Sequence, residues 1–183
     1  MRNCVLLLAV ALSLTFVGAV EAQSVDDQIA EAVLPLPESL RSGATVVTYD
    51  TEGNSRVLRE GTNTIVCQPD GPADGFSVQC YHESRVPTRN FQAALRAQGK
   101  SDEEVQAGVS AAQEAGTLQA LPSGSMHYRL QGDDAESASL LWTIRIPGAT
   151  HESTGLPTEP GDGTPWLMRA GTPAAHVMIP GRR

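Results

Sequence analysis

The feature that most constrains the fold of this chain is a pair of cysteines, Cys67 and Cys80, on either side of a turn-rich segment. Residues 69–75 (PDGPADG) between them are dense in proline, glycine and aspartate, which favour turns. The flanking stretches 64–68 and 76–81 are predicted to be strands. A bond between the cysteines would cross-link the two strands of an antiparallel meander and contribute on the order of 3 kcal/mol to stability.

The first 22 residues indicate the compartment in which such a bond would form. Arg2 precedes an apolar run at 5–17 (VLLLAVALSLTFV), and small residues follow at Val20 and Ala22, the pattern of a cleavable secretory signal peptide. The alternative is a membrane anchor that is never cut, but the run is short for a bilayer span and no stop-transfer charges follow it. We expect cleavage after Ala22 to leave residues 23–183 as a single globular domain, periplasmic or secreted.

Export also bears on the role of the cysteines. Cys4 lies in the predicted signal peptide, so two cysteines remain, and an even number in an oxidising compartment favours a disulfide. The alternatives are a thiol metal site and a redox pair. The chain has no C-x-x-C spacing and no second cysteine pair to complete a zinc site. We therefore predict a structural disulfide between Cys67 and Cys80.

The charge of the chain restricts the kinds of partner it can bind. Lysine and arginine number 13 against 21 aspartates and glutamates, which gives a net charge of -8 at pH 7. Sequence-independent binding to nucleic acid or to anionic lipid needs clustered positive charge, so neither partner is expected. With 17 glycines, 12 prolines and an aromatic content of 4%, we expect a modest core and many loops.

The pattern along the rest of the chain predicts an α+β fold with an antiparallel sheet and an insertion of two helices. The predicted strands are 44–49, 56–59, 64–68, 76–81, 126–130 and 140–146, with extended segments at 166–168 and 175–179. The predicted helices are 24–34, 88–98 and 101–115. The last of these begins with a capping box formed by Ser101 and Glu104. Strands followed by two helices and further strands are typical of the α+β class.

A repeated aromatic–arginine spacing marks candidate ligand-binding residues. Trp142 is followed by Arg145, and Trp166 by Arg169, with two residues between the members of each pair. An aromatic ring beside a guanidinium group can hold an anionic or planar ligand by stacking and bidentate hydrogen bonds. Ordinary strand packing, with the arginine stem over the ring, accounts for the spacing equally well.

Two histidines in predicted strands, His127 and His176, are candidate metal ligands. With Asp133 or Asp134 nearby they could bind a divalent metal, because imidazole suits zinc or copper. The alternative is a hydrogen-bonded histidine on a sheet face.

Gly99-Lys100-Ser101 resembles the end of a phosphate loop, but the preceding glycine that this motif needs is Ala94 here. No cofactor is expected.

Several short motifs resemble those of a family of exported bacterial proteins with no assigned activity. They occur in a specific order over most of residues 23–183: 58–63 (LREGTN), Cys67, 69–70 (PD), Cys80, 99–101 (GKS), 122–124 (PSG), 155–160 (GLPTEP), 165–168 (PWLM) and 175–179 (AHVMI). The resemblance implies a shared fold and export, and it supplies no reaction.

These observations lead to two functional hypotheses. The first is a non-enzymatic exported binding or envelope-associated module, whose partner is a small molecule or an envelope component, because no nucleophile–base signature is present. The second is a hydrolase or a divalent-metal-binding protein with a site around His176, Arg145 and Arg169. The second hypothesis requires His127, His176 and either arginine to converge in one concave pocket.

Overall fold

In a computed structural model of the chain, Cys67 and Cys80 form the predicted disulfide. They lie directly opposite one another on two antiparallel strands, β3 (Ile65–Gln68) and β4 (Phe76–His82), with their Cα atoms 4.0 Å apart. The structure describes residues 23–71 and 74–181. The predicted signal peptide, residues 1–22, lies outside the described residues.

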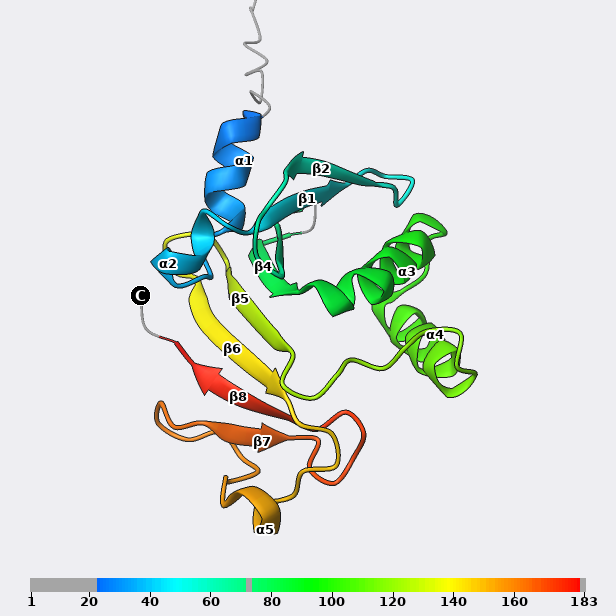
Figure 1. The fold of residues 1–183 in the computed structure, drawn as a ribbon, viewed down its shortest axis with the longest axis vertical. Coiled ribbons are helices and arrows are strands. Elements are labelled where there is room, and N and C mark those ends of the chain that lie inside the picture. Colours follow the sequence, from blue (N-terminus) through cyan, green and yellow to red (C-terminus); the bar gives the residue numbers. More distant parts are fainter. Residues whose placement is uncertain (1–22, 72–73, 182–183) are drawn as a thin grey trace, which may run out of the picture.

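The described residues contain an eight-stranded sheet and five α-helices, so the predicted α+β class is confirmed (Figure 1). The other strands are β1 (Thr45–Tyr49), β2 (Ser55–Arg59), β5 (Met126–Gly132), β6 (Ser139–Arg145), β7 (Trp166–Met168) and β8 (His176–Pro180). The helices are α1 (Val25–Ala32), α2 (Glu38–Arg41), α3 (Val86–Ala97), α4 (Asp102–Glu114) and α5 (His151–Thr154), with a 3-10 turn, η1 (Glu83–Arg85). The strand order across the sheet is β2-β1-β3-β4-β5-β6-β8-β7.

The sheet is mixed. The prediction of an antiparallel sheet is therefore wrong at one pair of strands. Strands β1 and β3 are parallel, whereas the other six pairings among the described strands are antiparallel. The reason is that β2 pairs with the outer side of β1, and residues 60–64 then cross the beginning of β1. Strand β3 therefore runs in the same direction as β1.

Glycine is required at this crossover because two backbone segments touch there. A Cβ atom on Gly61 would collide with the backbone of Gly43 and Thr45 and would lie 2.6 Å from the carbonyl carbon of Ala44. The backbone N–H groups of Thr62 and Asn63 donate to the Gly43 carbonyl oxygen at 2.8 and 2.9 Å. Part of the 58–63 motif thus has a structural role in this chain.

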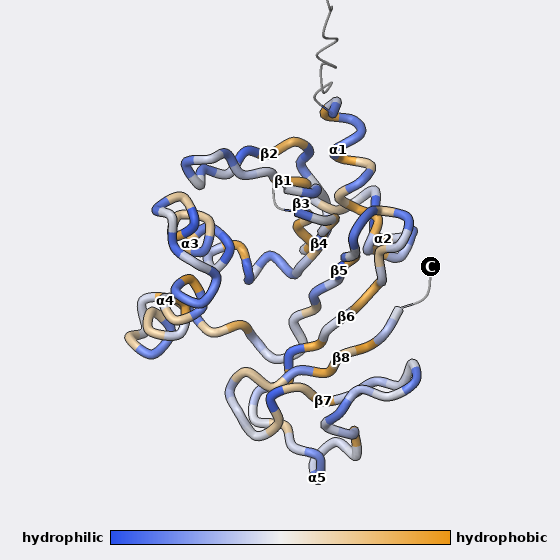
Figure 2. The backbone as a smooth tube through the Cα atoms, turned by 180° about the vertical axis from the view of Figure 1, so that it is seen from behind, coloured by the Kyte–Doolittle hydropathy of each residue, from blue (hydrophilic) through white to orange (hydrophobic). Residues whose placement is uncertain are grey.

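Side chains alternate between the two faces of the sheet, and each face carries its own apolar cluster. The first face packs against the α1–α2 segment through Ala32, Val33, Leu36, Ala44, Val46, Cys67, Cys80 and Tyr128. The second face packs against the start of α3 through Val47, Val66 and Tyr81, with Tyr49 and Val86 beside them. Figure 2 shows hydrophobic residues along β6 and β8, at the other end of the sheet.

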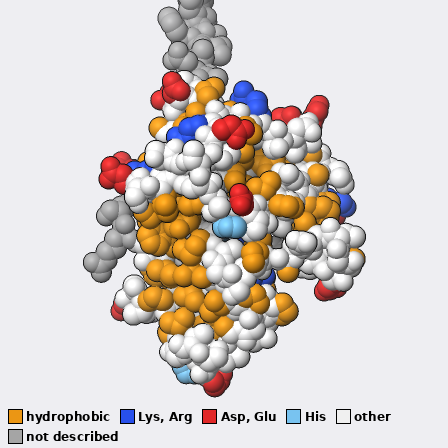
Figure 3. All heavy atoms as spheres, in the orientation of Figure 1, with side chains coloured by type: hydrophobic (Ala, Val, Ile, Leu, Met, Phe, Trp, Pro, Cys, Tyr) orange, Lys and Arg blue, Asp and Glu red, His pale blue; other side chains and the backbone are white. Residues whose placement is uncertain are grey.

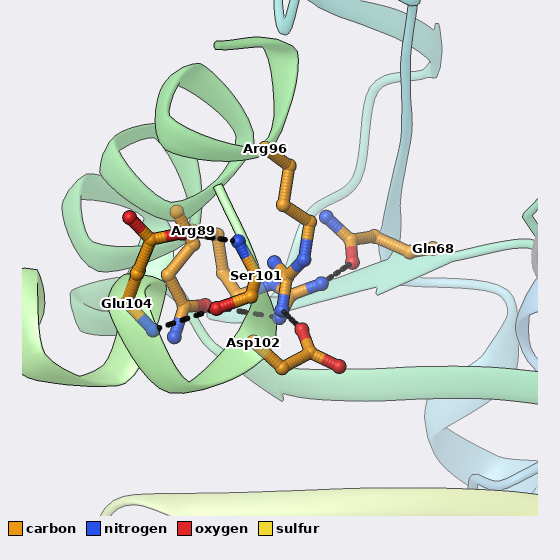
Figure 4. Close-up of polar contacts among 7 residues, drawn as sticks. Gln68, Arg89, Arg96, Ser101, Asp102 and Glu104 are labelled. Carbon is orange, nitrogen blue, oxygen red and sulfur yellow. Dashed lines mark hydrogen bonds and ion pairs between the residues drawn. The ribbon is translucent and has the colours of Figure 1, made fainter. Parts of the chain in front are cut away.

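Helices α3 and α4 are inserted between β4 and β5 as an antiparallel pair, which confirms the predicted two-helix insertion (Figure 1). The predicted capping box is present: the Ser101 hydroxyl accepts from the Glu104 N–H, and the Glu104 carboxylate accepts from the Ser101 N–H (Figure 4). Arg96 on α3 pairs with Asp102 on α4 at 3.0 Å. Among the residues that the structure describes, no helix is long and apolar enough to cross a membrane.

Candidate functional site

A cavity of about 370 Å³ lies on the second face of the sheet, beside η1 and the beginning of α4. Most of its polar lining residues are basic or can become so. They are His82, Arg85, His127, Arg129, Arg145, Arg169 and His176, together with Gln106, Ser125 and Thr143. Four of the arginines and three of the four histidines of the chain therefore surround one space.

Three neighbouring strands form one side of the cavity, because alternate side chains of a strand share a face. Strand β5 contributes His127 and Arg129, β6 contributes Thr143 and Arg145, and β8 contributes His176. The register places His127 opposite Thr143 and Arg145 opposite His176. The strand pairing thus brings together side chains that are up to about 50 residues apart in the sequence.

The other lining arginines come from irregular segments. Arg85 is the last residue of η1, whose first N–H groups are capped by His82: the Ser84 N–H donates to Nδ1 of His82 at 3.2 Å. Arg169 follows β7 with a φ of 54°, a left-handed conformation that is uncommon for residues other than glycine. The Thr172 hydroxyl and N–H hold this turn by donating to the Arg169 carbonyl oxygen at 2.7 and 3.2 Å.

The charge of the cavity is positive and uncompensated. No aspartate or glutamate is among its lining residues in the described part of the chain. Within that same part, the ion pairs are Arg96–Asp102 and Lys100–Glu104, and both lie elsewhere. The Nε atoms of Arg85 and Arg145 are fully buried and have no hydrogen-bond partner among the described residues. Buried unpaired donors are costly, and each of these two Nε atoms lacks the acceptor that a buried N–H group ordinarily has.

The same environment lowers the proton affinity of the basic groups. Burial, followed by the positive charge of Arg89, lowers the pKa of Arg85 to about 10, which leaves it protonated at neutral pH. Burial also lowers the pKa of Arg145, with Arg169 adding to the effect. Burial and then the charge of Arg85 hold the pKa of His127 well below its usual range. For His176, burial lowers the pKa, although a hydrogen bond to the Ala174 carbonyl opposes the change.

Comparison with models of known protein families, with curated proteins and with solved structures found no match. The chemistry of the cavity therefore rests on its own residues.

The structure brings together Arg145, Arg169, His127 and His176 but not the two tryptophans. Trp142 lies on the opposite face of β6 from Arg145, because residues three apart in a strand point to opposite sides. There its Nε1 donates to the Pro35 carbonyl oxygen at 3.3 Å, and its ring meets Tyr128 edge-on at 5.4 Å. Trp166 pairs with Met178 across β7 and β8 and is not a lining residue.

Trp142 instead lines a second, more open cavity of about 520 Å³ between the α1–α2 segment and strands β5 and β6. Its lining is largely apolar, comprising Leu34, Pro35, Leu36, Pro37, Leu130 and Leu140 in addition to Trp142, with Glu38 and Arg41. Figure 3 shows hydrophobic side chains gathered over the region of α2, β6 and β8. This surface carries no cluster of functional polar groups among the residues described.

The candidate metal ligands share a cavity without forming a metal-binding group. Among the described residues, no set of three or more histidine, cysteine, aspartate or glutamate side chains is placed to hold a metal ion. Asp133 and Asp134 lie beyond the far end of β5 from His127 and do not line the cavity. The Asp134 carboxylate instead accepts from the Ser137 N–H and hydroxyl, both at 2.8 Å.

Three lining residues, His82, Arg85 and Arg129, were not predicted from the sequence. The signal for Arg129 was present, since His127 and Arg129 are two residues apart in a predicted strand and must share a face. For His82 and Arg85 there was none, because His82 ends β4, Arg85 lies in η1, and both reach the cavity through the turn between them.

Proposed function

We propose that this protein is an exported, non-enzymatic binding module that holds a small anion in the cavity on the second sheet face. The observation that carries the proposal is the convergence of four arginines with three histidines, without a carboxylate among the lining residues described. An oxyanion in the cavity would supply acceptors to the guanidinium groups that line it, which face no carboxylate among the described residues. Guanidinium groups suit this task because their planar donors match carboxylate and phosphate oxygens.

The same charge argues against a divalent metal. A cation entering the cavity would meet Arg85, Arg129, Arg145 and Arg169, and the repulsion would offset much of what two imidazoles can contribute. The hydrolase alternative requires a group that orients a histidine as a general base, usually a carboxylate. The partners of His127 and His176 are the Gln79 side chain and the Ala174 carbonyl. These contacts favour binding over hydrolysis.

Export is part of the proposal and has two supports. The signal-peptide pattern of residues 1–22 predicts it, and the disulfide between Cys67 and Cys80 suits the oxidising compartments outside the cytoplasm. The ligand in such a compartment is either a free small anion or the anionic group of an envelope component. Both present the same oxygen acceptors to the arginines.

The test is thermal unfolding of the purified protein with added phosphate, sulfate or chloride at constant ionic strength. We expect a concentration-dependent rise in Tm with at least one oxyanion, because binding to the folded state at a hundred times Kd stabilises by about 2.7 kcal/mol. Arg145→Gln should abolish the rise, whereas Arg56→Gln, on the exposed strand β2, should retain it. The absence of any oxyanion-specific rise, or an equal rise in Arg145→Gln, would contradict the proposal.

A further inference from the structure

A chain of hydrogen bonds behind the cavity determines which nitrogen of His127 carries its proton. It begins at Arg89 on α3, whose Nη2 donates to Oε1 of Gln68 at 2.7 Å (Figure 4). The same oxygen accepts from Nε2 of Gln79 at 3.0 Å. This contact fixes the orientation of the Gln79 amide, so its Oε1 points away from Gln68 and can accept from another donor. That carbonyl oxygen lies 3.2 Å from Nε2 of His127. Because arginine can only donate, each role in the chain is fixed, and Nε2 of His127 carries hydrogen.

His176 is held in a defined state by a simpler contact. Its Nδ1 lies 2.8 Å from the backbone carbonyl oxygen of Ala174. A carbonyl oxygen only accepts, so Nδ1 of His176 carries hydrogen. His127 and His176 thus both use a protonated nitrogen to contact the protein, and each has a second nitrogen left over.

The second nitrogens, Nδ1 of His127 and Nε2 of His176, have no hydrogen-bond partner among the described residues. Neither is among the fully buried unpaired atoms, so both retain contact with solvent. The positive charges around the two rings favour their neutral forms. Arg85 at η1, Arg89 on α3 and Arg129 on β5 act on His127, and Arg85, Arg145 on β6 and Arg169 after β7 act on His176. The other titratable groups nearby are Tyr81 on β4, which meets the His127 ring edge-on, and His82 at the end of β4. A neutral imidazole makes each leftover nitrogen an acceptor.

The cavity therefore combines donors and acceptors in a way that a bare anion cannot match. The arginines offer N–H groups to oxyanion oxygens, but an oxygen lone pair facing either histidine acceptor would be repelled. A ligand that also carries an O–H group satisfies both kinds of partner. Sites that contain a dedicated acceptor discriminate strongly against analogues that lack the matching donor, because the acceptor is then left unpaired.

We propose that the cavity selects oxyanions that carry a hydroxyl hydrogen, with the arginines binding the charged oxygens and either His127 or His176 accepting from the hydroxyl. This inference rests on the proposed anion-binding function and narrows its ligand class. Two kinds of anion share the required chemistry: a phosphate group that retains one proton, and a hydroxycarboxylate.

The experiment is isothermal titration calorimetry of the purified protein with two pairs of anions whose members differ in one O–H group. Phosphate is compared with sulfate, and lactate with propionate, at about pH 7.5, where sulfate has no proton. We expect the O–H-bearing member of at least one pair to bind about tenfold more tightly, the difference made by roughly 1.4 kcal/mol of hydrogen bonding. The pair that shows the preference identifies the kind of ligand.

Two further titrations, one at lower pH and one with substituted histidines, test whether the histidines act as acceptors. Sulfate keeps its charge at about pH 5.5. Its affinity should rise several-fold there, because a bound anion favours protonation of the neighbouring histidines and so turns their acceptors into donors. His176→Phe should reduce the preference for the O–H-bearing anion, and His151→Phe on α5, which does not line the cavity, should retain it.

The outcomes separate this inference from the proposed function. Binding of anions with equal affinity within both pairs would overturn the selection by histidine acceptors while leaving the anion site intact. Sulfate affinity that stays constant between the two pH values would also overturn that selection. Failure of all four anions to bind would overturn the inference together with the proposed function.

Discussion

At the scale of single residues, Arg85 shows how the proposed anion site would exchange stability for binding. Its Nε is buried without a partner among the described residues, and burial next to Arg89 lowers its pKa. Replacing an unpaired buried charge by an apolar side chain of similar length removes that cost. We expect Arg85→Met to raise the free energy of unfolding in chloride buffer by about 1 kcal/mol, measured by urea denaturation.

The same variant should lose the stabilisation by oxyanions, so that its advantage disappears in phosphate buffer. Arg56→Met, at an exposed position of β2, is the matched control and should change stability by less than about 0.5 kcal/mol. A marked loss of stability in Arg85→Met in chloride would show that the guanidinium group has structural partners and would contradict the unpaired state.

The cavity histidines should make stability depend on pH in a defined direction. Burial and the neighbouring arginines lower the pKa values of His127 and His176 in the folded protein below the unfolded value of about 6.5. The unfolded chain therefore binds more protons below that pH, so stability is fully present above about pH 6.5 and falls as the pH is lowered.

Urea denaturation in chloride buffer should show this loss between about pH 7.5 and pH 5.5, at up to about 1.4 kcal/mol per pH unit for each histidine. The double variant His127→Gln, His176→Gln should lose most of the dependence, since glutamine does not titrate. If the natural sequence kept the same stability over this range, the histidines would have equal pKa values in the folded and unfolded states. That result would contradict the lowered pKa values.

Part of the candidate site could be predicted from the sequence, and the limits have physical reasons. Strand periodicity alone places His127 and Arg129 on one face of β5, and it also separates Trp142 from Arg145. The meeting of β6 with β8, and of both with η1, depends on tertiary packing between segments far apart in the chain. No local pattern in the sequence predicts the contact of β6 with β8 or the position of η1 beside them.

At the scale of secondary-structure elements, the crossover from β2 to β3 depends on Gly61. A methyl group there would meet the backbone of β1 and the residues before it, and backbone atoms cannot move aside as a flexible side chain can. We expect Gly61→Ala to lower the free energy of unfolding by at least about 2 kcal/mol, measured by urea denaturation. Gly71→Ala is the matched control, because a Cβ atom at Gly71 would meet nothing within 4 Å. Equal stabilities of the two variants would contradict the close approach.

Elements that depend on local signals were predicted from the sequence, whereas strand pairings that depend on the rest of the fold were not. Helix α4 was predicted from the capping box at Ser101 and Glu104, a local signal whose geometry is independent of the rest of the fold. The parallel pairing of β1 with β3 depends on which side of β1 the strand β2 occupies. Residues 60–64 are compatible with either connection by composition alone, so the mixed character of the sheet emerges from the assembled structure.

At the scale of the whole molecule, charge is separated in a way that supports anion binding. The chain has a net charge of -8, whereas the lining of one cavity is entirely neutral or basic in the described residues. A concave surface of one charge sign concentrates the field inside it and attracts small counter-ions, while the acidic exterior repels large polyanions. This distribution of charge supports the proposal that the ligand is a small anion and not nucleic acid or an anionic membrane surface.

The most direct test of an anion site in this cavity is an NMR titration of the isotope-labelled protein with phosphate, followed at backbone amides and histidine side chains. We predict saturable chemical-shift changes centred on His127, Arg145 and His176, on the second face of the sheet. Amides of Leu34 and Leu130, which line the apolar cavity on the opposite face, should not respond. Saturable changes confined to that opposite face, or no saturable changes at any described residue, would contradict the anion site.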